Sequence, residues 1–91
     1  MRASVSPNPV AYGAYPTLYA RSSPGAVCTA SVLYSTGYAP RSFDGSALTV
    51  GSGGVVAWTW HMESRGAGGT ATVTCSWRGQ SKTATTGFSI V

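Results

Sequence analysis

The sequence predicts a single all-β domain in which two antiparallel sheets pack face to face. The chain has 91 residues and a mass of 9.3 kDa, which suffices for one domain and is too small for two. Good helix formers are scarce, because the chain holds only three Leu, one Glu and one Lys. Runs of alternating apolar and polar residues recur at short intervals, separated by Gly, Pro and Ser. We therefore expect residues 1–91 to form one domain built from short strands.

The N-terminal half of the chain predicts four of these strands. The first is interrupted by Pro7-Asn8-Pro9, which suits an edge position because proline cannot donate to a ladder. Ser22-Ser23-Pro24-Gly25 is a strong turn signal between the second and third strands. A long polar connection, residues 35–46, precedes a short fourth strand. The expected strand ranges are 3–6, 15–21, 26–34 and 47–50.

The C-terminal half predicts three more strands, over residues 55–62, 70–77 and 81–91. Gly51-Ser52-Gly53-Gly54 is the turn that leads into the first of them. Residues 70–77 alternate between apolar residues and Thr or Ser, as in a half-buried antiparallel strand. Arg78-Gly79-Gln80 then predicts a tight hairpin, whereas residues 63–69 form a loop.

Two cysteines and three tryptophans define the expected core. Seven strands and a Cys…Trp…Cys order favour a seven-stranded antiparallel immunoglobulin-like β-sandwich. Cys28 and Cys75 begin and end strands that are antiparallel neighbours in this topology, so we expect a disulfide within or beside one sheet, near a core tryptophan. Two buried free thiols are the alternative. The side chains expected in the core are Val32, Trp58, Trp60, Val73, Phe88 and Ile90.

Catalytic chemistry is poorly represented in this chain. Asp44 and Glu63 are its only acids and His61 is its only histidine. A Ser-His-Asp set can be drawn from them, but any serine-rich chain permits that. The sequence holds no nucleophile elbow, phosphate-binding loop or HExxH motif. We expect a protein that is not an enzyme and that binds no metal and no cofactor.

Two groups of residues are candidates for binding a partner. The turns at 21–25, 51–54 and 78–82 are expected at one end of the sandwich, which would place Arg21, Arg78 and Lys82 near Trp77. Solvated turn charges are the simpler interpretation. Tyr15 and Tyr19 are expected to share a strand face, and they form a second candidate surface for a protein or a glycan. The alternative is that they only cover the edge of the sandwich.

The remaining composition bears on partners and location. The basic residues are spread along the chain without a run, so we expect no nucleic-acid partner, and no apolar stretch is long enough for a membrane span. A disulfide favours an extracellular or cell-surface setting. Residues 1–9 contain no apolar segment, so we expect no signal peptide. Either the domain was excised from a longer product, or it leaves the cell another way, as virion proteins do.

Several segments resemble a known group of proteins. They are Val5-Ser6-Pro7-Asn8-Pro9-Val10, Ser22-Ser23-Pro24-Gly25-Ala26-Val27-Cys28, Trp58-Thr59-Trp60, Gly69-Thr70-Ala71-Thr72-Val73-Thr74-Cys75 and Gly87-Phe88-Ser89-Ile90-Val91. Together they are similar to the small immunoglobulin-like domains of secreted and surface proteins of actinobacteria and related bacteria. Similar domains decorate phage capsids and tails. The chain departs from this group at Arg65-Gly66-Ala67-Gly68-Gly69, where the group often carries Pro-Gly. We also expect the usual multi-domain context to be absent, which leaves a free-standing or an excised unit open.

The resemblance implies a spacer, adhesion or accessory role. We expect a non-enzymatic structural or adhesion module of an extracellular surface assembly, which contacts a protein partner or further copies of itself. A virion decoration or tail accessory protein is the first alternative, and a glycan-binding module is the second.

Overall fold

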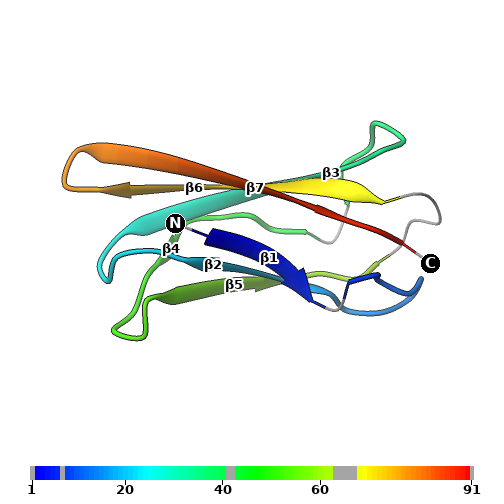
Figure 1. The fold of residues 1–91 in the computed structure, drawn as a ribbon, viewed down its shortest axis with the longest axis horizontal. Coiled ribbons are helices and arrows are strands. Elements are labelled where there is room, and N and C mark those ends of the chain that lie inside the picture. Colours follow the sequence, from blue (N-terminus) through cyan, green and yellow to red (C-terminus); the bar gives the residue numbers. More distant parts are fainter. Residues whose placement is uncertain (1, 7, 41–42, 63–67, 91) are drawn as a thin grey trace.

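The protein is described by a computed structural model that covers residues 2–6, 8–40, 43–62 and 68–90. These residues form strands and connections but no helix. The strands lie in two antiparallel sheets, one in the order β1-β2-β5 and the other in the order β4-β3-β6-β7. Figure 1 shows the two sheets as layers lying one over the other. The expected all-β class and the packing of two antiparallel sheets are confirmed.

The three-stranded sheet consists of β1 (Arg2–Ser6), β2 (Thr17–Arg21) and β5 (Val55–Thr59). Residues alternate along each strand between the interior and solvent, because successive side chains of a strand point to opposite faces. Val5, Leu18 and Trp58 are aligned by the strand register and form one buried row across the sheet. This row is the apolar face that the other sheet covers.

The four-stranded sheet consists of β3 (Val27–Tyr34), β4 (Leu48–Thr49), β6 (Gly69–Trp77) and β7 (Gln80–Phe88). Ala71, Val73 and Cys75 of β6 are buried, whereas the Thr residues between them lie on the outer face. Arg78 and Gly79 link β6 to β7 with φ values of 50° and 76°. Two successive positive φ values give the turn whose twist matches that of a hairpin, which explains the continuous pairing from Trp77↔Gln80 to Gly69↔Phe88.

The core lies between the sheets, and the six side chains expected there are all buried: Val32, Trp58, Trp60, Val73, Phe88 and Ile90. Trp60 is its largest fully buried side chain and donates a 3.3 Å hydrogen bond from Nε1 to the Tyr34 hydroxyl. Its ring also meets the rings of Phe43 and Phe88 edge-on, at centroid distances of 5.2 and 6.0 Å. Tryptophan thus supplies buried area that leucine and isoleucine provide in most cores.

Two expected strand boundaries differ from the structure around Pro16. The second strand begins at Thr17 rather than Tyr15, and the fifth ends at Thr59 rather than Met62. The segments that flank these two strands remain hydrogen-bonded beyond the strand ends: Trp60 N donates to Pro16 O, and Met62 N donates to Ala14 O. Pro16 has no N–H with which to continue the ladder, so the pairing there becomes irregular.

The last strand is also shorter than expected. It ends at Phe88, and Ile90 instead forms an isolated parallel bridge with Val10, whose N–H donates to Ser89 O at 2.7 Å. The remaining expected position, Val91, and most of the expected loop at 63–69 lie outside the described residues. This bridge brings the segment after β1 alongside the end of the chain.

Candidate functional site

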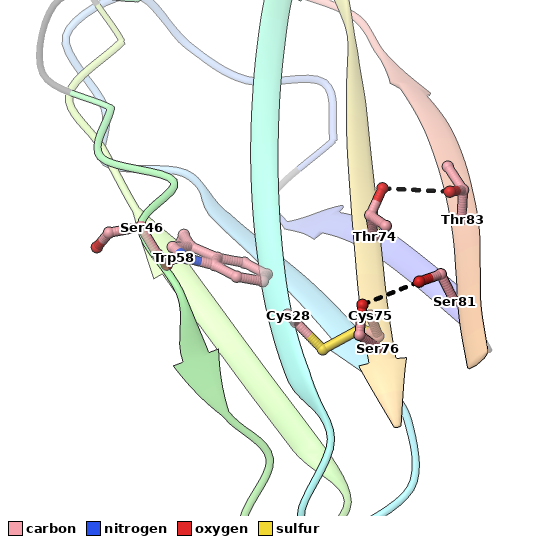
Figure 2. The surroundings of a disulfide bond; sticks show 8 residues. All are labelled: Cys28, Ser46, Trp58, Thr74, Cys75, Ser76, Ser81 and Thr83. Atoms are coloured by element: carbon pink, nitrogen blue, oxygen red, sulfur yellow. Dashed lines mark hydrogen bonds between the residues drawn. A yellow bond between two sulfur atoms is a disulfide. The ribbon is translucent and has the colours of Figure 1, made fainter. Parts of the chain in front are cut away.

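The cysteines form a disulfide inside the four-stranded sheet. Cys28 of β3 and Cys75 of β6 are directly opposite in the register, with their Cα atoms 4.0 Å apart and an S–S distance of 2.04 Å. Both side chains are buried on the inner face of the sheet. The expected pairing within one sheet is therefore confirmed. Figure 2 shows the Trp58 side chain reaching from β5 toward β3 on the side where the bridge lies.

Three turns meet at one end of the sandwich, which we call the turn end: residues 21–25, 51–54 and 78–80. Ser22 N donates to Gly54 O at 3.0 Å, and Gly25 N donates to Val50 O at 2.8 Å. These bonds tie the β2–β3 turn to the β4–β5 turn. In Figure 1 both turns lie at the left together with the β6–β7 turn, while the C-terminus lies at the opposite end.

The β2–β3 turn approaches Trp77 closely because of its sequence. Ala26 N donates to Ser23 O, Pro24 fixes the first central position, and Gly25 takes a φ of 90° at the second. A Cβ atom at Gly25 would lie 3.7 Å from Trp77 Nε1. The Pro-Gly pair therefore places this turn against the indole at the end of β6.

The turn end holds an open hollow of about 800 Å³, which we call the turn-end hollow. Its lining residues are Arg2, Arg21, Ser22, Ser23, Cys75, Trp77, Gln80 and Lys82. A second, smaller hollow of about 160 Å³ adjoins it on the outer side of the three-stranded sheet, lined by Arg2, Ser4, Tyr19, Arg21 and Val55. Because Arg2 and Arg21 line both, the two arginines form the boundary between the hollows.

The turn-end hollow is strongly basic. Arg2 and Arg21 are directly opposite in the β1–β2 register, so two like charges share one face of the sheet. Lys82 pairs with Cys75 and therefore lies on the face of its sheet that is turned toward the other sheet. Asp44 is the only acidic side chain of the described residues, and its carboxylate accepts a hydrogen bond from Ser46 N, away from the lining of either hollow. Arg2, Arg21 and Lys82 thus line one hollow that has no carboxylate among its described lining residues.

The structure brings most of the expected cationic group together. Arg21, Trp77 and Lys82 line the turn-end hollow, as the placement of the turns led us to expect. Arg78 also lies near Trp77 as expected, with its guanidinium over the ring at 4.4 Å from the centroid, but it does not line the hollow. The sequence interpretation missed Arg2 as a candidate. Antiparallel pairing of the first two strands, which places residue 2 opposite residue 21, was the signal that could have identified it.

The two tyrosines expected on one strand face lie in different surroundings. Tyr15 precedes β2, so the two do not share a strand as expected. Tyr15 is 69% exposed, and the centroid of its ring lies 5.0 Å from that of the His61 ring. Tyr19, on the outer face of β2, instead lines the smaller hollow beside Arg2 and Arg21. Only Tyr19 therefore adjoins the basic region.

The described part of the chain holds neither a candidate metal site nor a candidate membrane-spanning helix. It contains no group of three or more His, Cys, Asp or Glu side chains placed to hold a metal ion. The same residues include no helix long and apolar enough to cross a membrane. Comparisons of the chain with protein-family models, with curated proteins and with solved structures found no match.

Proposed function

We propose that this chain is a non-enzymatic structural and adhesion module of an extracellular surface assembly. The observation that carries the proposal is the buried Cys28–Cys75 disulfide inside a compact sandwich. Disulfides form and persist in oxidising compartments, and small secreted domains use them to compensate for a thin hydrophobic core. A module of this kind acts through its shape, its stability and the surfaces that it presents.

We further propose that the strand arrangement is immunoglobulin-like. The orders β1-β2-β5 and β4-β3-β6-β7 support this, because immunoglobulin-like sandwiches pair their first, second and fifth strands in one sheet and their third, sixth and seventh in the other. The fourth strand pairs with β3, as an added strand does in the variable-type arrangement. The disulfide differs from the antibody pattern because it joins neighbouring strands of one sheet.

A role in contact rather than catalysis fits the chemistry of the turn end. Apart from the disulfide-bonded Cys75, its hollow is lined by cations, hydroxyls, an amide and one indole, which are groups that recognise a ligand. A nucleophile next to an oriented base is not among these described lining residues. Rigid elements and hydrogen-bonded turns hold the lining side chains, as is usual for binding loops at the end of a β-sandwich.

Surface labelling of the source cells or particles tests this proposal. Intact material is treated with a membrane-impermeant protease and, separately, with a thiol-alkylating reagent before lysis under denaturing conditions. We expect the protein to be accessible from outside, with Cys28 and Cys75 unalkylated until a reductant is added. A protein protected inside the cell, with both cysteines alkylated directly, would contradict the proposal.

A further inference from the structure

The turn-end hollow holds like charges that repel each other, and a bound anion would relieve that repulsion. Arg2 and Arg21 stand directly opposite on adjacent strands, an arrangement that destabilises a sheet. Lys82 adds a third cation from the opposite sheet. An anion bound between them would replace repulsion by charge-assisted hydrogen bonds, and two guanidinium groups suit planar or tetrahedral oxyanions. The geometry therefore points to a ligand that carries carboxylate or sulfate groups.

The rest of the lining narrows the class of ligand. Trp77 is 41% exposed and presents an aromatic surface at the hollow, with the Arg78 guanidinium stacked on its ring. Ser22, Ser23 and Gln80 add hydroxyl and amide groups that both donate and accept hydrogen bonds. Protein interfaces have an apolar core, whereas no aliphatic side chain occurs among the described lining residues. Sugars match this lining, because each ring has an apolar C–H face and a rim of hydroxyls.

We propose that the turn-end hollow binds a short acidic oligosaccharide. The anionic groups lie against Arg2, Arg21 and Lys82, and one sugar ring lies against the exposed surface of Trp77. The volume of about 800 Å³ is within the range of small-ligand sites, so it accommodates a few sugar rings. This inference adds a ligand to the adhesion module proposed above, and that proposal supplies only its biological setting.

Titration calorimetry on the purified, oxidised protein tests the proposal. The probes are a heparin-derived hexasaccharide, which carries sulfates and carboxylates, hexagalacturonate, which carries carboxylates only, and neutral maltohexaose. We expect binding of one or both acidic probes and none of maltohexaose. The preference between the two acidic probes identifies the anionic group. The affinity falls as NaCl is raised from 50 to 150 mM, because exposed charges are then screened.

Variants connect any binding to the hollow. Arg21→Gln should weaken binding of the acidic probe about tenfold, the usual effect of losing one hydrogen bond between charged groups. Trp77→Ala should weaken it several-fold. Thr74→Val is the control, because Thr74 lies on the outer face of the four-stranded sheet and does not line the hollow. Its affinity for the acidic probe should stay within about twofold of that of the natural protein.

Three outcomes would overturn the inference. If neither acidic probe binds, the proposed class of ligand is wrong. If the affinities are unchanged in both Arg21→Gln and Trp77→Ala, the proposed location of the site is wrong. Hexaglutamate or a hexamer of single-stranded DNA that binds as tightly, with the same loss in Arg21→Gln, would assign the hollow to an acidic peptide or a nucleic acid instead. Each result is independent of the surface labelling above, so a failed titration leaves the proposed extracellular role to its own test.

Discussion

The two sheets of this sandwich differ in how they are held together and in what they present to solvent. The four-stranded sheet has strands of eight and nine residues at its centre and a disulfide between them. The three-stranded sheet has strands of five residues and places two arginines opposite each other. The comparison indicates that the four-stranded sheet carries the covalent link of the domain, whereas the three-stranded sheet supplies two of the three cations that line the turn-end hollow.

Their outer faces differ in shape and charge. On the four-stranded sheet, Thr74 and Thr83 are joined by a 3.2 Å hydroxyl hydrogen bond, and Ser76 and Ser81 by one of 3.0 Å, as Figure 2 shows. The three-stranded sheet has a similar bond of 2.9 Å between the Thr17 and Thr59 hydroxyls. On this sheet, however, the smaller hollow interrupts the face beside the arginine pair. The hollow and the arginine pair, rather than the hydroxyl bonds, therefore distinguish the two outer faces.

Removing the disulfide is the change expected to have the largest effect. A Cys28→Ser/Cys75→Ser variant should lose about 4 kcal/mol of unfolding free energy, because the bridge closes a loop with a sequence separation of 47. Urea denaturation followed by circular dichroism measures the loss. Adding dithiothreitol should shift the natural protein toward the variant and leave the variant itself unchanged. Equal midpoints for the natural protein and the variant would mean that this sheet does not depend on its covalent link.

Truncating the central tryptophan should have the next largest effect. Trp60→Ala should cost about 3 kcal/mol or more, because it leaves a cavity between the sheets and removes the hydrogen bond to Tyr34. Trp77→Ala is the matched control, since it removes the same side chain from a half-exposed position and should cost less than about 1 kcal/mol. Thermal melts of the two variants make the comparison, and equal losses would contradict the assigned core.

Relieving the arginine pair should produce a smaller effect of opposite sign. Arg2→Thr should raise the unfolding free energy by about 0.5 kcal/mol, because it removes a like charge directly across from Arg21. Arg2→Lys keeps the charge and should bring no gain. The difference should shrink in 1 M NaCl, where screening acts over about 3 Å. Destabilisation by Arg2→Thr, measured in low-salt denaturation, would show that the pair contributes to stability.

The hydroxyl face should be the least sensitive part of the molecule. Thr74→Val removes one exposed hydrogen bond but keeps a β-branched side chain on the outer face, so the unfolding free energy should change by less than about 0.5 kcal/mol. Binding of the acidic probe should also be unchanged. A loss of affinity in Thr74→Val, measured by calorimetry, would move the ligand from the turn end to the outer face of the four-stranded sheet.

Much of the four-stranded sheet could be predicted from the sequence. The alternation over residues 70–77 fixes which side chains face inward, and it places Cys75 on the same face as Val73. Cys28 and Cys75 then fall at opposite ends of antiparallel strands, which is sufficient to predict their bridge. Such local periodicity reports directly on burial.

The features that depend on distant pairing were not predicted. Tyr15 is separated from the strand because Pro16 interrupts the ladder. The alternation of apolar and polar residues along a strand does not reveal where that strand stops pairing with its neighbour. Arg2 joins the turn end only through its pairing with Arg21. Ile90 leaves its strand to bridge Val10, a contact across most of the chain. Local pattern therefore explains the core, whereas the basic hollow requires the register between strands.

One measurement tests most directly whether stability and binding belong to different parts of the sandwich. In a titration of ¹⁵N-labelled protein with the acidic probe that binds more tightly in the calorimetry, followed by NMR, the indole N–H of Trp77 and the amides of Arg2, Arg21 and Lys82 should shift together. The indole N–H groups of Trp58 and Trp60, which donate to Ser46 O and the Tyr34 hydroxyl, should stay in place. Shifts centred on Tyr15 and His61, or no shifts at saturating probe, would contradict the account.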